Sequence, residues 1–285
     1  MAIDISQRIL KIHPTLSKGH KKIANAVLHE YEKVAYMTAS ELGRKTEVSE
    51  STVVRFAAVL GYEGYSEFQR AIQELVKTKL TPNQRIEITN KRIGKGDILE
   101  NVMHSDIDKI KYTLDNLNRD AFHDSVKAIL DAKNIYVMGA RSAEPVARIL
   151  QYNLSLIFDN VKFITASSTA EVFEQMFSID ESDVLIAFSF PRYSSKVVNA
   201  VKFADSKNAT TIAVTDSVIS PLAQYAEHLL LAQSDMASYM DSLVAPISII
   251  NAIIVEIARK REKSITKRFD TLEKIWDEYD VYTKN

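Results

Sequence analysis

The sequence predicts two domains of different fold class. An all-α helix-turn-helix domain is expected over residues 1–80, and an α/β domain, a parallel sheet between two layers of helices, over residues 98–285. The length of 285 residues corresponds to two domains at roughly 150 residues each. The first third carries only short amphipathic helical patterns, whereas the remainder alternates β-branched runs with helical stretches. Residues 81–97 are polar and basic and are expected to form the linker.

Four amphipathic segments predict short helices in the first domain. Thr38-Ala39-Ser40-Glu41 matches a capping box, and Ser49 is a typical N-cap residue. The predicted helices are Ser17–Glu30, Thr38–Lys45, Ser49–Leu60 and Ser66–Lys77.

In the second domain, strands and helices alternate, which is typical of βαβ units. The predicted strands are Asn134–Met138, Val161–Thr165, Val184–Phe188, Thr210–Thr215 and His228–Leu231. The helices expected between them are Glu144–Phe158, Thr169–Ile179, Ser194–Ser206 and Pro221–Ala226. Helices over Ile98–Leu117 and Asp120–Leu130 precede the sheet, and a long apolar helix, about Ser238–Arg261, and a charged tail helix follow it.

Composition limits the possible functions. The net charge of −1 conceals an asymmetry: residues 1–96 hold 16 Lys/Arg against 10 Asp/Glu, and the remainder holds 20 against 27. A basic first third suits a polyanion such as DNA. The chain has no cysteine, so disulfides and thiolate metal sites are excluded, and its six histidines show no metal-ligand spacing. No apolar run approaches the roughly 20 residues of a membrane span. We therefore expect a cytoplasmic protein without metal or cofactor.

The segment Thr38–Tyr62 has the pattern of a helix-turn-helix. Its apolar residues fall where two short helices that cross at a tight turn share a core: Leu42, Val48, Val53 and Phe56. Gly43 provides a small residue where the helices approach each other. Glu47 stands in the turn where glycine is common, so the match is good but imperfect.

A helix that begins at Ser49 is expected to enter the DNA major groove with its N-terminus first. Arg55 then points outward and can bond bidentately to a guanine edge, while hydroxyls bond phosphates or bases. The candidate DNA-binding residues are Thr38, Lys45, Ser49, Ser51, Thr52 and Arg55. The structural alternative is a helical hairpin that only packs, with Arg55 as a solvated charge.

Two loops follow predicted strands and precede helices, where open α/β sheets bind ligands. The first is Met138–Ser142 and the second is Ser189–Ser195, and both place hydroxyls and backbone N–H groups at the positive end of a helix. The candidate anion-binding residues are Gly139, Arg141, Ser142, Ser189, Arg192, Ser194 and Ser195. The structural alternative makes Ser142 and Ser194 ordinary N-caps.

These segments together resemble the RpiR family of regulators, which joins a helix-turn-helix domain to a sugar isomerase (SIS) domain. The resemblance rests on Val48–Gln69, Met138–Ser142, Ser189–Ser195 and Val214–Leu230. It implies a DNA-binding regulator, not an enzyme, in which Ser142, Ser189 and Ser194 hold the phosphate of a sugar phosphate that modulates binding to double-stranded operator DNA. It also implies a homodimer or homotetramer assembled largely through the SIS domains.

The chain departs from the family pattern at one place. SIS domains commonly have Ser-Gly where this chain has Pro191-Arg192. Proline removes a backbone N–H that could donate to phosphate, and Arg192 adds a permanent charge that can compensate.

The alternative function is a sugar-phosphate isomerase with a helical appendage, which needs a positioned base. Glu144, Glu171 and His228 are the candidates, but no carboxylate–histidine pair stands out, so no catalytic residue is assigned.

Overall fold

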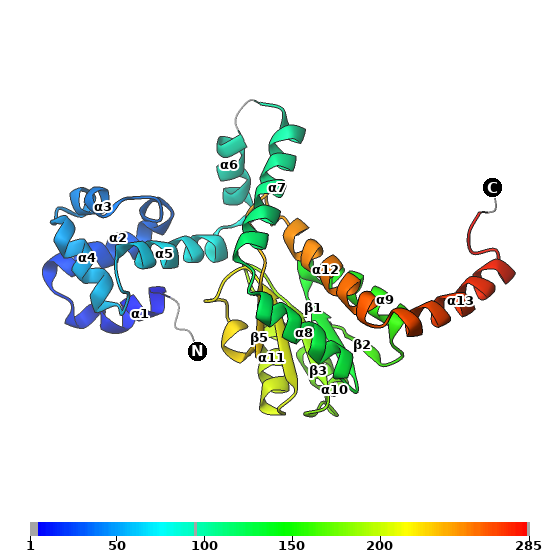
Figure 1. The fold of residues 1–285 in the computed structure, drawn as a ribbon. Helices are drawn as coiled ribbons and strands as arrows, with labels where there is room; N and C mark the ends of the chain where they lie inside the picture. Colours follow the sequence, from blue (N-terminus) through cyan, green and yellow to red (C-terminus); the bar gives the residue numbers. More distant parts are fainter. Residues whose placement is uncertain (1–4, 94–95, 284–285) are drawn as a thin grey trace. The chain divides into compact units, whose positions relative to one another are not determined.

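The computed structural model describes residues 5–93 and 96–283, and the chain divides into two compact units between Ile88 and Thr89 (Figure 1). Each unit is described by itself.

The first unit is all-α, as predicted. Its helices are α1 (Ile5–Ile12), α2 (Lys18–Val34), α3 (Ala39–Thr46), α4 (Glu50–Val59), α5 (Tyr65–Lys79) and the first part of α6 (Pro82–Ile93). A core of fully buried side chains from α1 to α5 joins them, including Ile9, Ile23, Leu42, Phe56 and Phe68. Phe56 and Phe68 meet edge to face with their ring centroids 5.7 Å apart, which links α4 to α5.

The predicted linker differs from the structure, because most of it is the helix α6. Thr81 and Gln84 form a capping box: the Thr81 N–H donates to Gln84 Oε1 at 2.9 Å, and the Gln84 N–H donates to Thr81 Oγ1 at 3.3 Å. Pro82 occupies the first helical position, where its missing N–H costs nothing. The polar composition of the segment concealed these start signals.

The second unit is a three-layer α/β/α domain. Two helices, α7 (Ile98–Asn116) and α8 (Arg119–Asp131), precede the sheet. The strands are β1 (Ile135–Gly139), β2 (Val161–Ile164), β3 (Val184–Phe188), β4 (Thr210–Thr215) and β5 (His228–Leu231). They form one parallel sheet in the order β2-β1-β3-β4-β5 (Figure 1).

Alternating residues of the strands supply two separate cores, as the period of two in a β-strand requires. Val137 and Ile186 face α8, α9 (Glu144–Ile157) and α12 (Val244–Lys260). Met138 and Ala187 face α10 (Thr169–Gln175) and α11 (Ser195–Ser206). Because both faces are covered, the central strands β1 and β3 are buried at every residue.

In the first unit, the helix predicted to end at Glu30 continues to Val34. In the second unit, three elements differ from the prediction by more than one residue. The apolar helix begins at Val244 instead of Ser238, because the polar residues before it fold into a loop in which Ser242 N–H donates to Asp235 O and Ser234 Oγ donates to Ser242 O. The segment Pro221–Ala226 holds only a short 3₁₀ turn, Ala223–Tyr225. The helix predicted to reach Ile179 ends at Gln175. The charged tail helix is present as α13 (Glu262–Glu278).

Candidate nucleic-acid interface and anion site

Helices α3 and α4 cross at a tight turn and share the predicted core. Leu42, Val53 and Phe56 are fully buried. A Cβ on Gly43 would come within 2.9 Å of the Val48 carbonyl oxygen, so only glycine fits this close approach. Glu47 adopts a left-handed φ of 53°, the conformation that favours glycine. Its carboxylate accepts a hydrogen bond from Lys22 Nζ, which lowers the pKa of Glu47.

Hydroxyl groups gather at the first turn of α4. Ser49 caps the helix, because its Oγ accepts the Thr52 N–H at 3.3 Å, and this oxygen also lies 2.9 Å from Ser51 Oγ and 2.8 Å from Thr52 Oγ1. Ser51 and Arg55 are exposed, and Arg55 Nε donates to the Ser51 carbonyl at 3.2 Å. Four of the predicted residues therefore form one polar surface at the start of α4, which we call the α4 surface: Ser49, Ser51, Thr52 and Arg55.

The other two predicted residues are engaged elsewhere in the domain. Thr38 forms the predicted capping box with Glu41: its N–H donates to Glu41 Oε2 at 2.7 Å, and its hydroxyl oxygen accepts the Glu41 N–H at 3.2 Å. Lys45 Nζ pairs with Glu30 at 2.8 Å, and only 27% of its side chain is exposed. To contact a phosphate, Thr38 must give up a hydrogen bond to Glu41, and Lys45 must give up its ion pair with Glu30.

His20 of α2 lies beside the α4 surface, and no sequence pattern indicates this position. Its ring centroid is 5.6 Å from that of Phe56. Partial burial and then the charge of Arg55 lower the pKa of His20, because both disfavour the imidazolium form. No local pattern connects α2 with α4, so only the folded structure brings this ring to the DNA-facing candidates.

The two predicted anion loops follow neighbouring strands at the centre of the sheet. The strand order reverses between β1 and β3, since β2 lies on one side of β1 while β4 and β5 lie beyond β3 (Figure 1). Gly139 and Phe188, the last residues of these strands, are register partners. Open α/β sheets bind ligands outside the carboxyl ends of the strands at this reversal point. The topology thus brings both loops to the edge where a ligand is expected.

The first loop makes a sharp turn from β1 into α9. A Cβ on Gly139 would meet the Ala143 carbonyl oxygen at 2.5 Å, so no other residue fits without a backbone shift. Arg141 then adopts a left-handed φ of 57°. Ser142 and Arg141 are both exposed, and Ser142 stands two residues before α9 and is not its N-cap.

The second loop has the same backbone feature. Arg192 is exposed and adopts a left-handed φ of 66°. Ser189 is buried, and its Oγ accepts the Ser194 N–H at 3.2 Å, so this hydroxyl shapes the loop and keeps its own proton to donate. Ser195, the first residue of α11, is exposed. Non-glycine residues held in left-handed conformations cluster at binding sites, where the backbone is held for the ligand.

Both helices at this edge begin without a side-chain cap. Ala143 and Ser194 occupy the N-cap positions of α9 and α11, and neither side chain bonds the N–H groups of the first turn. By contrast, Ser168 accepts the Glu171 N–H and caps α10. Ser142 and Ser194 therefore do not act as ordinary caps, and both residues lie at the same edge of the sheet as the positive ends of α9 and α11.

The three residues considered as catalytic bases are either paired with a neighbouring side chain or remote from the anion loops. Glu144 forms an ion pair with Arg148 at 3.0 Å, and Glu171 accepts a hydrogen bond from the Ser167 hydroxyl. His228 is the first residue of β5 and so lies at the opposite, amino edge of the sheet from the anion loops.

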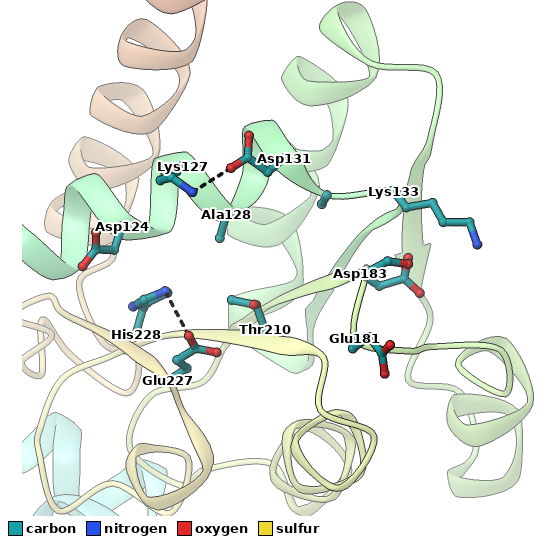
Figure 2. Close-up of a pocket in the computed structure, with 12 residues that line it drawn as sticks. Asp124, Lys127, Ala128, Asp131, Lys133, Glu181, Asp183, Thr210, Glu227 and His228 are labelled. Carbon is teal, nitrogen blue, oxygen red and sulfur yellow. Dashed lines mark hydrogen bonds and ion pairs between the residues drawn. The ribbon is translucent and has the colours of Figure 1, made fainter.

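That amino edge carries a recess of about 580 Å³, shown in Figure 2. His228 lies 3.8 Å from Glu227 in it, and Lys127 pairs with Asp131 at 2.9 Å. The buried Asp183 accepts both the backbone N–H and the side-chain amide of Asn134. The Asp183–Asn134 bonds tie the start of β3 to the start of β1, whereas the other two pairs are local to α8 and to the start of β5.

Within residues 5–93 and 96–283, no group of three or more His, Cys, Asp and Glu side chains is arranged to hold a metal ion. In the same ranges, no helix is long and apolar enough to cross a membrane.

Comparison with known proteins identifies both units. Residues 3–79 match the helix-turn-helix domain of the rpiR family, and residues 128–256 match the SIS domain. The chain belongs to the RpiR family of transcriptional regulators, with an N-terminal helix-turn-helix domain and a SIS domain.

Relatives agree with this assignment. An uncharacterised HTH-type transcriptional regulator of Haemophilus influenzae is 27% identical over 232 residues, 80% of this chain and 79% of that protein. The fold is similar to that of Vibrio vulnificus NanR complexed with ManNAc-6P, with a TM-score of 0.62 at 19% identity, covering 98% of this chain and all of that one. The sugar isomerase domain of an RpiR transcription factor from Sphaerobacter thermophilus has a TM-score of 0.58 at 25% identity, over 61% of this chain and 96% of that one.

Proposed function

We propose that the α4 surface reads operator DNA, that the loops after β1 and β3 bind a phosphorylated sugar, and that this ligand changes operator affinity. Reading operator DNA implies a cytoplasmic protein. The observation that carries the ligand proposal is the pair of hydroxyl-bearing loops at the reversal point of the sheet, in front of two helices without side-chain caps. A phosphate there gains charge-assisted hydrogen bonds from hydroxyls and backbone N–H groups.

A sensing role is supported over catalysis. Proton transfer between two sugar carbons requires a base within hydrogen-bond reach of the substrate. Glu144 is held by Arg148, Glu171 by its bond from Ser167, and His228 is at the other edge of the sheet. NanR, of the same fold, was solved with ManNAc-6P, a phosphorylated sugar derivative. We therefore propose that the carboxyl edge of the sheet binds the phosphorylated sugar without converting it.

A thermal-shift screen of sugar phosphates that includes ManNAc-6P tests the ligand. A compound that binds the folded state raises the melting temperature by mass action. Ser142→Ala and Ser194→Ala should each weaken binding of the active compound by about 1.5–3 kcal/mol, because each removes a donor to a charged group. DNA affinity without ligand should not change. The sensor proposal is wrong if no phosphosugar shifts the wild-type protein, or if the protein interconverts one catalytically.

Arg192 offers a matched pair of variants that separates charge from backbone strain. Arg192→Gly removes the guanidinium and suits the left-handed φ of 66°, whereas Arg192→Ala removes the guanidinium and keeps the strained conformation. If Arg192 compensates for Pro191, both variants weaken ligand binding similarly and only Arg192→Gly keeps or raises the melting temperature. Unchanged ligand affinity in both variants would assign Arg192 to solvent.

A further inference from the structure

Lys196 is a cation at the carboxyl edge of the sheet without a carboxylate partner. It is the second residue of α11 and is half-buried. Its ammonium donates to the backbone carbonyl oxygens of Ala166 at 2.6 Å and of Ser167 at 2.8 Å, both in the loop after β2. Among the residues that the structure describes, no carboxylate forms an ion pair with it. Because an ammonium has three N–H donors, these two bonds leave one donor for a further acceptor.

The electrostatic setting of Lys196 favours an anion. The N-terminus of a helix carries a partial positive charge, which disfavours a cation in the first turn. The first turn of α11 contains no acidic residue and has no side-chain cap. Two carboxylates that stand at the starts of the neighbouring helices are engaged, because Glu144 pairs with Arg148 and Glu171 accepts a hydrogen bond from Ser167. A bound anion would supply the counter-charge that these side chains do not.

The side chain of Lys196 also passes the place where the ligand is expected. In the sheet, β1 lies between β2 and β3 (Figure 1). Neighbouring strands are about 4.8 Å apart, so the ends of β2 and β3 are separated by about 10 Å. Lys196 starts after β3 and bonds the loop after β2, so it crosses near the carboxyl end of β1. Ala140 of the first anion loop and Val197 of α11 belong to one buried cluster, against which Ala166 packs.

The position of the Lys196 ammonium is fixed, which distinguishes it from the two arginines of the anion loops. Arg141 and Arg192 are exposed, and among the described residues their guanidinium groups make no hydrogen bond or ion pair. Each arginine must therefore lose side-chain freedom when it binds a ligand, whereas a group that is already held loses less. Lys196 is the cation of this edge that is best prepared to bind.

We propose that Lys196 is a ligand-binding residue whose third N–H donates to an anionic oxygen of the ligand, and that its charge makes the site bind a dianionic phosphate more tightly than a monoanion of the same shape. The proposal rests on the proposed binding of a phosphorylated sugar at this edge and adds a cation to the two anion loops. Coulomb attraction is proportional to the charge of the ligand, so a fixed ammonium stabilises a dianion more than a monoanion.

The alternative role of Lys196 is structural, as a tether that fastens the loop after β2 to α11. A tether stabilises the ligand-free protein and helps to shape the site, but its loss weakens two ligands of the same shape alike. A phosphate monoester carries about −1.5 to −2 charges at pH 7, whereas the sulfate monoester of the same sugar is a monoanion. The ratio of the affinities for these two esters therefore separates the two roles.

Isothermal titration of the full chain at about pH 8 measures this ratio. The probes are the hexose 6-phosphate that raises the wild-type melting temperature most and the 6-sulfate of the same hexose. Lys196→Met should weaken the phosphate ester about 10- to 100-fold, the loss expected for a hydrogen bond to a charged group, and the sulfate ester clearly less. Lys196→Arg should keep most of the preference, because it keeps the charge. Equal weakening of both esters in Lys196→Met would overturn the proposal and leave the tether.

A matched control lies on the same helix. Lys202 is exposed on α11, and its ammonium lies 6.0 Å from the centroid of the Tyr225 ring. It stands six residues beyond Lys196, about 9 Å along the helix axis at 1.5 Å per residue. Lys202→Met should therefore leave both affinities at the wild-type values. A loss of preference in Lys202→Met equal to that in Lys196→Met would overturn the proposal, because general surface charge would then explain the effect.

Inorganic phosphate makes the test independent of the sugar. Compared with sodium chloride at equal ionic strength, it should raise the melting temperature of the wild type and of Lys202→Met, and much less that of Lys196→Met. If Lys196→Met responds like the wild type while Ser142→Ala and Ser194→Ala do not, the role of Lys196 is wrong and the anion loops stand. A loss in Lys196→Met alone supports Lys196 and contradicts the two serines. A wild type that responds to neither inorganic phosphate nor any phosphosugar overturns both proposals.

Discussion

Arg55 lies on the exposed surface of α4, one turn after Ser51, and its described contacts within the unit are a bond to the Ser51 carbonyl and its charge beside His20. Arg55→Ala should therefore leave the melting temperature almost unchanged. It should weaken binding to a cognate duplex, selected from a random pool, by about 1–3 kcal/mol if Arg55 contacts a base edge. Fluorescence anisotropy measures this loss. The pKa of His20 should rise at the same time, because one of its two lowering causes is removed.

Lys45→Ala provides the comparison for Arg55→Ala. Lys45 is held by Glu30, and a contact with phosphate would replace that ion pair. Loss of the Lys45 amine should weaken binding to cognate and to unrelated DNA by similar amounts, because phosphate contacts carry no sequence information. It should also make DNA affinity depend less steeply on salt concentration, because fewer phosphates are neutralised. If Arg55→Ala weakens binding to cognate and to unrelated DNA by the same factor, Arg55 contacts a phosphate and not a base.

The first helix of the motif, α3, starts with a cap whose strength depends on pH. The backbone N–H of Thr38, followed by its hydroxyl, bonds the carboxylate of Glu41 and lowers the pKa of that group. The unfolded chain therefore takes up a proton at a higher pH than the folded one. The contribution of this cap is present above the ordinary Glu pKa near 4.5 and is lost as the pH falls through the folded value.

Glu41→Gln isolates this effect, because glutamine can still accept the Thr38 N–H but does not titrate. The difference in unfolding free energy between the wild type and Glu41→Gln should be constant above pH 5 or so and should shrink below it. Urea denaturation of the full chain at several pH values, followed by a signal from the first unit, measures the difference. A pH-independent difference would show that Glu41 does not titrate with folding.

Elements of the fold differ in how well the sequence predicts them, for physical reasons. The strands β1 and β3 were predicted closely, because burial on both faces leaves an apolar run. The strand β4 was predicted from its β-branched residues. Helix α6 was missed because its start signal, the Thr81–Gln84 capping box, stands in a polar segment without a strong apolar face. The start of α12 was predicted too early, because hydroxyl side chains in a polar segment can bond the backbone in place of helical hydrogen bonds. Here the Ser234 hydroxyl donates to the Ser242 carbonyl oxygen.

The candidate site shows the same division. The loops after β1 and β3 were found from local signals, since a glycine and serines between a strand and a helix are contiguous in sequence. Their neighbourhood in space depends on strand order, which follows from the sheet as a whole. The placement of His20 beside Arg55, and of Glu30 against Lys45, comes from α2 packing on the motif. No periodicity within one segment carries such information.

At the scale of the whole molecule, the proposed function requires a route from the ligand loops of the second unit to the α4 surface of the first. Helix α7 belongs to the segment that joins the two units along the chain. Polar contacts pin α7 to the loop after β5, which starts at the same sheet edge as the anion loops. Ser242 Oγ donates to Asp106 Oδ1 at 2.7 Å, and the Gln233 N–H donates to Thr113 Oγ1 at 2.9 Å. Lys109, almost fully buried, lies 3.4 Å from the same Asp106 oxygen.

Ser242→Ala removes the contact between the loop and Asp106 while leaving the anion loops intact. We expect ligand affinity to stay near that of the wild type and the ligand-induced change in DNA affinity to become smaller, because a ligand shifts two states only by its differential affinity for them. Ser248→Ala is the control, since that hydroxyl bonds Val244 O within α12 and joins no other element. Anisotropy titrations of DNA with and without the active phosphosugar measure the coupling. A Ser242→Ala protein with the full wild-type response would show that the signal leaves the sheet by another path, and an equal loss in Ser248→Ala would show that the effect of Ser242 is one of general stability.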